Sequence, residues 1–584
     1  MKSFLKYTLA TIAGILVVNF LGLVIFFIII GAATKQEEPT VLENSVLVAK
    51  FNSPIIDRAN DDPFSQFAAG NFGMQGVMGL DQILKDIDKA KNDEDISGIF
   101  LRLSGIPSSM ATVEEIRDAL MDFKADGKFI IAHADAFTQK SYYLATAADK
   151  IYLTPTGDFD FKGLQAKVLY FKRALDKLGI EVQVVRHGDY KSAVEPFLTN
   201  EMSDENREQL DEMISSVWDK MIYEISLARG ISEEDLEKYA DELAVAMDER
   251  AVEKKMIDGT RYYDQVLDEL RELTETEEDD DIPSISLKKY ADVSGNKEAS
   301  GNRIAVIYAM GTVVTGEAEE GMIGSDRIAR AIRKARKDDK VKAIVFRVNS
   351  GGGSALASEV IYREVKLAAE VKPVVASLGD VAASGGYYIV CPADTIVASE
   401  TTITGSIGVF GLIPNMQELM NEKIGITTGL VKTNKYADIM STTRPMTQDE
   451  RIIIKEYIDD VYTTFVNHVA EGRSMSFEEV DAIGGGRVWS GVNAMEIGLI
   501  DVYGGLEKSV EIAAEMADLD NYRLTSLPTL EDPITRLMKQ ITGGVKAKII
   551  SKELGSAYEL YKQVEMINNM EGLQAIMPYT LDIY

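Results

Sequence analysis

The chain has 584 residues, more than one hydrophobic core usually serves, so at least two domains are expected. Its 93 acidic residues outnumber its 62 basic ones, and the resulting formal net charge of −31 argues against nucleic-acid binding. A single cysteine, Cys391, excludes an intramolecular disulfide and a Cys-rich zinc site.

The N-terminal segment is the most hydrophobic part of the chain. No charged residue lies between Lys6 and Lys35, and about 20 apolar residues suffice to cross a bilayer. Residues 1–35 are therefore predicted to be a cytoplasmic N-terminus and a single transmembrane anchor, with the rest of the chain outside the cytoplasm. A cleaved signal peptide is the alternative, because small residues follow the apolar run at Gly31-Ala32-Ala33.

After the anchor the sequence repeats itself. Val46–Ala49 and Ile304–Ile307 both predict buried strands that open a repeat. Further pairs match at one constant separation along the chain: Arg102 with Arg347, Asp135 with Asp380, Tyr142 with Tyr387, and Asp149 with Asp394. A register held over this distance indicates a tandem duplication.

The duplication divides the chain into an N-terminal repeat at 44–272 and a C-terminal repeat at 303–530. Residues 273–302 are acidic and turn-rich, which predicts a solvated linker. Residues 531–584 form a C-terminal tail, in which Ile534–Lys552 mixes apolar and basic residues. That pattern suits a membrane contact, cover of a neighbouring subunit, or a solvated amphipathic helix.

Within each repeat, short apolar runs alternate with amphipathic segments. In the second repeat, Ala343–Val348 and Val374–Leu378 predict strands, whereas Ala355–Ala369 has the apolar spacing of a helix. A further helix is expected to begin near Ser384. This alternation predicts an α/β fold with a largely parallel sheet covered by helices.

A glycine-rich loop, Asn349–Ser354, lies between a predicted strand and a predicted helix. Its three glycines free backbone N–H groups to face one point, which suits an anion or a developing oxyanion. A tight turn is the alternative interpretation. The loop is not a Walker motif, because no Gly-Lys-Ser/Thr follows it.

Ser384 lies among Ala and Gly residues directly after a predicted strand, as in a nucleophile elbow, although a helix N-cap serine is the simpler interpretation. Lys191 lies among small and apolar residues in the first repeat. Burial lowers the pKa of a lysine and makes it a competent general base. Taken alone, such a lysine is more often a surface or ion-pair residue.

The repeat links these two residues. Ser384 matches Gln139 in the first half, and Lys191 matches Ala437 in the second half. Gly352 and Gly353 match Pro107 and Ser108, so the first half lacks the glycine loop as well. Each half has kept one member of a Ser/Lys pair and lost the other, which predicts one site merged across both halves.

With these motifs in hand, the sequence resembles the signal peptide peptidase A family in its long tandem-repeat form, from about Val46 to Gly505. The resemblance rests on four motifs: YKSAVEPF at 190–197, GGGSALASE at 351–359, VAASGGYYI at 381–389 and TGSIGV at 404–409. It implies two tandem Clp-protease/crotonase-like repeats, a Ser-Lys dyad, and no metal or cofactor. One departure is Gly351, where this loop of the family usually carries proline.

By resemblance, Ser384 is the nucleophile, Lys191 the general base and Ser406 the residue that orients the lysine. The N–H groups of Gly353 and Gly385 are implied to form the oxyanion hole. The implied enzyme is a homotetramer in the bacterial inner membrane with its catalytic domain outside the cytoplasm. Its implied partners are hydrophobic peptides, signal-peptide remnants and the bilayer. A crotonase-like acyl-CoA enzyme and a non-catalytic membrane scaffold are the alternatives.

Overall fold

The computed structural model of the chain describes residues 39–59, 76–278, 280–294, 300–530 and 573–577, together with most positions of 6–22. The predicted anchor, 1–35, lies largely outside the described residues, and the tail segment Ile534–Lys552 lies wholly outside them. Among the residues that are described, no helix has the length and apolar character needed to span a bilayer.

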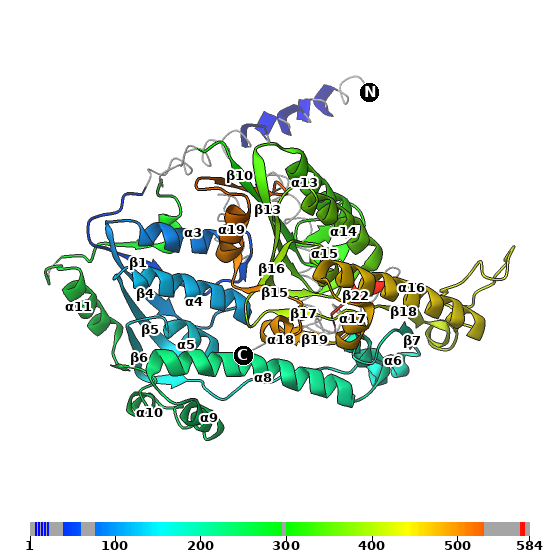
Figure 1. Cartoon of the computed structure of the whole chain (residues 1–584), viewed down its shortest axis with the longest axis horizontal. Helices are drawn as coiled ribbons and strands as arrows, with labels where there is room; N and C mark the ends of the chain where they lie inside the picture. Colours follow the sequence, from blue (N-terminus) through cyan, green and yellow to red (C-terminus); the bar gives the residue numbers. More distant parts are fainter. Residues whose placement is uncertain are drawn as a thin grey trace.

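Two sheets with the same strand order form the centres of the two halves (Figure 1). The N-terminal sheet runs in the order β9 (Ser284–Ser286), β1 (Ser45–Ala49), β4 (Ile96–Leu103), β5 (Phe129–Phe137), β6 (Lys150–Phe159) and β8 (Gly259–Thr260). The C-terminal sheet contains the path β21 (Arg523–Leu527), β10 (Arg303–Met310), β13 (Val341–Ser350), β15 (Val374–Ala383), β16 (Thr395–Ala398) and β20 (Val502–Tyr503). All these pairs are parallel, so the predicted α/β fold and tandem duplication are confirmed.

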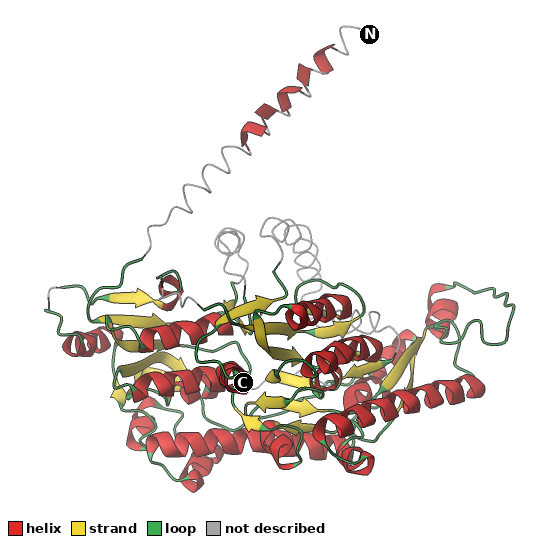
Figure 2. Cartoon of the chain, turned by 45° about the horizontal axis from the view of Figure 1, so that its top comes forward, coloured by secondary structure: helices red, strands yellow, loops and turns green. Residues whose placement is uncertain are grey.

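The helices repeat as well, and they lie on both sides of the strands (Figure 2). The N-terminal half has α3 (Leu80–Lys91), α4 (Met110–Ala125), α5 (Gln139–Ala145) and the long α8 (Asp204–Arg229). Their counterparts are α13 (Ser325–Lys337), α14 (Ala355–Ala369), α15 (Gly385–Val390) and α16 (Gln448–Arg473). Both long helices have 26 residues, begin at a capping Ser or Thr and end at a left-handed residue, Gly230 or Ser474.

Smaller helices complete the two halves. In the N-terminal half they are α6 (Lys172–Leu178), α7 (Glu195–Leu198), α9 (Glu233–Asp241), α10 (Asp248–Glu253), α11 (Tyr263–Leu273) and α12 (Leu287–Tyr290). In the C-terminal half they are α17 (Phe477–Ile483), α18 (Gly491–Glu496) and α19 (Leu506–Met516). Part of the segment predicted to be a linker, 273–302, therefore belongs to the fold, because β9 closes the N-terminal sheet beside β1.

A third sheet joins the two halves. Its order is β12 (Met322–Gly324), β11 (Thr312–Val314), β14 (Gly352–Ser354), β22 (Gln574–Ile576), β18 (Phe410–Asn415) and β7 (Glu181–Arg186). Strand β7 comes from the N-terminal repeat and pairs antiparallel with β18 along its whole length. In Figure 1, β7 and α6 lie beside β18, on the side of the C-terminal half. This pairing places the segment that follows β7, from the N-terminal repeat, against the C-terminal half.

Short strands extend this framework. In the C-terminal sheet, β15 also pairs with β17 (Ile403–Gly405), which pairs antiparallel with β19 (Val488–Ser490). A separate two-stranded sheet consists of β2 (Ile55–Ile56) and β3 (Met78–Gly79).

A buried arginine connects the halves. Arg347 on β13 has no exposed side-chain surface, and its guanidinium donates to Asp57 at 2.5 Å and to Glu115 at 2.6 Å, both from the N-terminal repeat. Its repeat counterpart, Arg102 on β4, is exposed and lies 4.5 Å from the centre of the Tyr263 ring. Equivalent positions have therefore taken different roles after the duplication.

We expect Arg347→Met to lower the free energy of unfolding by about 3–5 kcal/mol, because it leaves two buried carboxylates without their partner. Arg102→Met is the matched control and should cost less than about 1 kcal/mol, since an exposed cation over a ring contributes little. Chemical denaturation of the two variants measures the difference. Equal losses would contradict the assigned role of the buried arginine.

Candidate functional site at the junction of the halves

Ser384 lies at the turn between β15 and α15. Its backbone has φ 55° and ψ −115°, a conformation that residues other than glycine rarely adopt. The turn is held by two backbone hydrogen bonds, from Ser384 N to Gly405 O at 2.8 Å and from Tyr388 N to Ser384 O at 2.8 Å. The predicted sharp strand-to-helix turn is present, and it fixes the direction of the hydroxyl.

Lys191 reaches this serine from the N-terminal repeat. It follows β7 and precedes the 3₁₀ helix η1 (Ser192–Val194), and its side chain is fully buried. The Lys191 Nζ lies 2.8 Å from Ser384 Oγ, 2.9 Å from Ser406 Oγ and 3.0 Å from the Ser406 carbonyl oxygen. The structure thus brings together the three side chains singled out in the sequence.

Burial lowers the pKa of Lys191 well below the ordinary lysine value. A neutral amine has two N–H groups and one lone pair. Ser406 Oγ donates its own hydrogen to the Gly486 carbonyl oxygen at 3.2 Å, so it accepts from the amine. In a neutral amine, two N–H groups directed to the oxygens of Ser406 would leave the lone pair for the hydroxyl of Ser384.

A glycine turn, Gly484–Arg487, presses against the lysine. At Gly486, with φ 92°, a Cβ would lie 2.6 Å from the Lys191 Cβ, closer than any side chain can approach. The same turn accepts the Ser406 N–H at the Arg487 carbonyl oxygen, at 2.6 Å. This support was missed in the sequence, although the run Gly484-Gly485-Gly486 marks a place where backbones approach closely.

His187 holds the other side of this turn. Its ring stacks on Tyr462 with centroids 3.8 Å apart, and its Nδ1 lies 2.7 Å from a carboxylate oxygen of Asp459. The Tyr462 hydroxyl donates to Asp481 at 2.6 Å and accepts from Gly485 N at 3.2 Å. The histidine therefore supports the scaffold of the turn through its ring contacts with Tyr462 and Asp459.

Gly353 and Gly385 lie next to each other beside the serine. A Cβ on Gly385 would be 3.0 Å from the Gly353 amide nitrogen, so the two amides share one small space. A Cβ on Gly353 would lie 2.0 Å from the Val313 carbonyl oxygen, so only glycine fits there. At Gly351, in contrast, a Cβ would meet nothing closer than Met577 Cβ at 3.6 Å, so this position does not require glycine.

The equivalent place in the N-terminal half is filled by a side chain. Gln139, the counterpart of Ser384, is buried. Its Oε1 accepts from Lys162 N at 2.6 Å and from Gly163 N at 2.8 Å, and its Nε2 donates to Gly163 O at 3.0 Å. The glutamine thus stabilises the loop at Lys162 and Gly163. At the position where the second half has the Ser384 hydroxyl, the first half has a side chain with a structural role.

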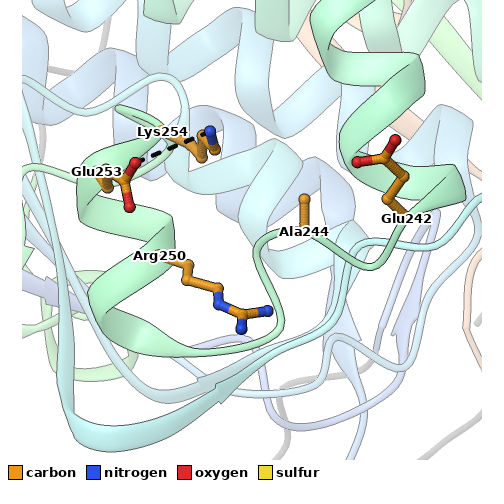
Figure 3. A pocket seen from close by; sticks show the side chains of 5 residues that line it. All are labelled: Glu242, Ala244, Arg250, Glu253 and Lys254. Atoms are coloured by element: carbon orange, nitrogen blue, oxygen red, sulfur yellow. Dashed lines mark ion pairs between the residues drawn. The ribbon is translucent and has the colours of Figure 1, made fainter.

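An open pocket of about 320 Å³ lies elsewhere, between α9 and α10 of the N-terminal half (Figure 3). It is lined by Glu242, Ala244, Arg250, Glu253 and Lys254. None of the site residues belongs to it. Among the described residues, no group of three or more His, Cys, Asp and Glu side chains is arranged to hold a metal ion.

Known proteins that are similar to most of this chain include several named as proteases. The family model described as Peptidase family S49 matches twice, at residues 122–277 and 366–520, once in each repeat. "Protease 4" of Salmonella typhi is 37% identical over 481 residues, covering 80% of this chain and 77% of that protein. "Serine protease SPPA, chloroplastic" of Arabidopsis thaliana is 32% identical over 545 residues, covering 92% of this chain and 78% of that protein.

Among solved structures, a ClpP1 mutant from Listeria monocytogenes aligns with 35% of this chain and 94% of its own, at 14% identity. The TM-score of 0.23 is too low to establish a shared fold. The Clp-protease/crotonase-like type of the two repeats stays a prediction.

The matched family and these relatives define the class of the protein as a serine protease. More particularly, the chain belongs to peptidase family S49.

The buried lysine should make the stability of the protein depend on pH. In the unfolded chain Lys191 is protonated below its ordinary pKa of 10.5, whereas in the folded protein the pKa is much lower. Between these two values folding releases a proton, so each unit by which the pH falls costs about 1.4 kcal/mol. Lys191→Met should therefore raise the free energy of unfolding at neutral pH and remove this slope. Denaturation of both proteins at several pH values measures this difference. The same dependence of the free energy of unfolding on pH in both proteins would contradict the prediction.

Proposed function

We propose that the chain is a membrane-anchored endopeptidase with a Ser-Lys dyad that degrades signal-peptide remnants and other hydrophobic peptides. Ser384 is the nucleophile, Lys191 the general base, and Ser406 orients the lysine. The observation that carries the proposal is the contact of 2.8 Å between the Lys191 amine and the Ser384 hydroxyl, both fully buried. An uncharged amine at this distance can accept the hydroxyl proton as the serine attacks.

The reaction has two steps. Ser384 Oγ attacks a peptide carbonyl carbon while its proton passes to Lys191. The N–H groups of Gly353 and Gly385 stabilise the negative oxygen of the tetrahedral intermediate, each by roughly 3–4 kcal/mol. Lys191 then gives the proton to the leaving amine, and afterwards it activates the water that hydrolyses the acyl-enzyme.

The apolar surroundings of the site support hydrophobic substrates. The segment that carries Lys191 packs into one cluster with β7 and β18, made of Leu175, Val184, Ala193, Val194, Phe197, Phe410 and Leu412. These side chains are buried, and they make the surroundings of the segment that carries Lys191 apolar. We further propose a homotetramer in the bacterial inner membrane, with a cytoplasmic N-terminus, the anchor at 1–35 and the catalytic part outside the cytoplasm.

Removing either member of the dyad should abolish catalysis. Ser384→Ala and Lys191→Ala are each expected to lower the turnover of a hydrophobic fluorogenic peptide by roughly 10⁴-fold or more. Ser384→Ala should also lose labelling by a fluorophosphonate probe. The matched control is Ser509→Ala, which removes a buried hydroxyl that donates to the carbonyl oxygen of Gly505, the N-cap residue of α19. Robust turnover by either dyad variant would refute the proposal.

The rate should rise with pH as Lys191 loses its proton. Ser406→Ala removes one acceptor of the Lys191 N–H groups, so it disfavours the ammonium further and should lower the pKa of Lys191. We expect the acid limb of kcat/KM to move to lower pH, while the plateau falls roughly 10²-fold because the amine is less well oriented. A plateau that falls with no movement of the limb would contradict the role of Ser406.

A further inference from the structure

The strands that lead into the two parts of the oxyanion hole lose their register at one place. Strand β13 runs into the glycine-rich loop, and its neighbour β15 runs into the Ser384 turn (Figure 1). Val348 is paired with Leu378, but Ser350, two residues further, is paired with Ala382, four residues further. Strand β15 therefore has extra residues here. Irregularities of this kind redirect the residues that follow them and are common beside active sites.

The side chain of Asn349 fills this irregularity. Its Oδ1 accepts the Val381 N–H at 3.2 Å, in the stretch where β13 and β15 are not paired. A Cβ on Gly379 would lie 2.9 Å from Asn349 Cγ, so the amide group lies directly against the backbone of β15. The Asn349 carbonyl oxygen accepts the Gly311 N–H at 2.9 Å. The residue is thus fixed by its main chain and by its side chain.

Two carboxylates hold the amide nitrogen of Asn349. Its Nδ2 donates to Asp57 Oδ2 at 2.9 Å and to Asp380 Oδ2 at 3.2 Å. Asp57 is buried and comes from the N-terminal half. The other oxygen of Asp380 accepts from the N–H and the hydroxyl of Thr112, each at 2.9 Å, at the start of α4 in the same half. An amide turned the other way would point its oxygen at both carboxylates, so this network fixes its orientation.

Ser350 connects Asn349 to the glycine-rich loop. Its hydroxyl accepts the Gly352 N–H at 3.1 Å. A Cβ on Gly386 would lie 2.5 Å from the Ser350 carbonyl oxygen, so the loop packs tightly against the start of α15. The residue after Gly352 and the residue before Gly386 supply the two N–H groups assigned to the oxyanion. A shift of Asn349 would therefore change the distance between these two groups.

The two repeats show that the asparagine accompanies the serine. Asp380 has a counterpart in the N-terminal half, Asp135, which accepts from the Thr154 hydroxyl at 2.7 Å. The counterpart of Asn349 is Ser104, which is exposed. The sheet can therefore be built without an asparagine at this position. The half that keeps the nucleophile has the amide, which indicates a role in the site and not in the sheet alone.

We propose that Asn349 is a positioning residue of the oxyanion hole, and that Asp57 of the N-terminal half holds it there. This inference rests on the proposed function and deepens it. The amide of Asn349 fixes the glycine-rich loop relative to the Ser384 turn, so that the N–H groups of Gly353 and Gly385 converge on one oxygen. The N-terminal half then contributes twice to the reaction, through the general base and through the support of the oxyanion hole.

Asn349→Leu tests this role, because leucine has nearly the same shape but makes none of the hydrogen bonds of the amide. We expect kcat for a hydrophobic reference peptide to fall roughly 10²-fold, with KM changed less than about threefold, since an oxyanion hole acts in the transition state. The matched control is Ser104→Ala, at the equivalent position of the first half. It should keep kcat within about twofold, because exposed positions away from the site tolerate substitution.

The failure of this inference is distinct from the failure of the proposed function. A natural kcat in Asn349→Leu, or a higher KM with kcat unchanged, would overturn the inference and leave the proposed function standing. A natural chain that does not hydrolyse the reference peptide at all would overturn the proposed function itself.

Asn349→Asp keeps the shape of the side chain and tests the donor. The new carboxylate faces Asp57 and Asp380, which disfavours its charge, so it should bind a proton as the pH falls and then donate as the amide does. The ionisable groups around this position are Asp57 and Arg58 after β2, Tyr308 on β10, Glu115 on α4, Arg347 on β13 and Asp380 on β15. Both cations already have partners, because Arg347 bonds Asp57 and Glu115 and Arg58 lies over the Tyr308 ring.

The ratio of kcat/KM between Asn349→Asp and the natural chain is the quantity to measure, because the titration of Lys191 is common to both proteins. We expect this ratio to rise at least about tenfold between about pH 8.5 and about pH 6, as the new carboxyl group becomes protonated. A merely structural loss would lower the ratio equally at every pH, and that result would overturn the inference.

The part assigned to Asp57 has its own matched pair of variants. Asp57→Asn and Glu115→Gln each remove one carboxylate partner of Arg347, but only Asp57→Asn also disturbs the acceptor of the Asn349 amide. We expect kcat to fall roughly tenfold in Asp57→Asn and less than about twofold in Glu115→Gln, since only the former loosens the oxyanion hole. Equal losses of kcat in the two variants would overturn the role of Asp57.

Discussion

The contact between the Lys191 amine and the Ser384 hydroxyl depends on the burial of the lysine. The backbone of the glycine turn packs against Lys191 and keeps water away from it. Gly486 lies so close to Lys191 that no side chain fits between them, and the two oxygens of Ser406 take up the N–H groups of the amine. Burial lowers the lysine pKa, and the hydrogen bonds hold the amine beside the Ser384 hydroxyl. A solvated lysine at the same distance would be charged and could not accept a proton.

That arrangement explains why two diverged repeats are kept in one chain. Ser384, Ser406 and the glycine turn all belong to the C-terminal half. Only Lys191 comes from the N-terminal half, on the segment that follows β7, the strand paired with β18. The buried link from Arg347 to Asp57 and Glu115 holds the same two halves in register. In the first half, Gln139 occupies the position equivalent to Ser384 and bonds the backbone of its own half.

The sequence was sufficient for the α/β fold, the duplication and the meeting of Ser384, Lys191 and Ser406, because each lies in a motif and because the repeat reveals which residue each half has lost. It was not sufficient to predict the packing of Gly486 against Lys191 or the presence of strand β22. Glycine turns are common, and the close approach of Gly486 to Lys191 involves residues far apart in the chain. The tail strand is too short to have a period, and only its partners, Gly353 and Phe410, identify it. β9 was missed for a related reason, since three residues beside an acidic run have no pattern of their own.

The pairing of β7 with β18 also sets the order of events during synthesis. The N-terminal half leaves the ribosome first, and domains generally fold as they emerge. At that stage Lys191 has neither β18 beside its segment nor the glycine turn to cover it, so it is hydrated and carries its ordinary charge. Hydrolysis at this site can therefore begin only after the chain has been synthesised past Arg487. A shorter nascent chain lacks the glycine turn and cannot form the site.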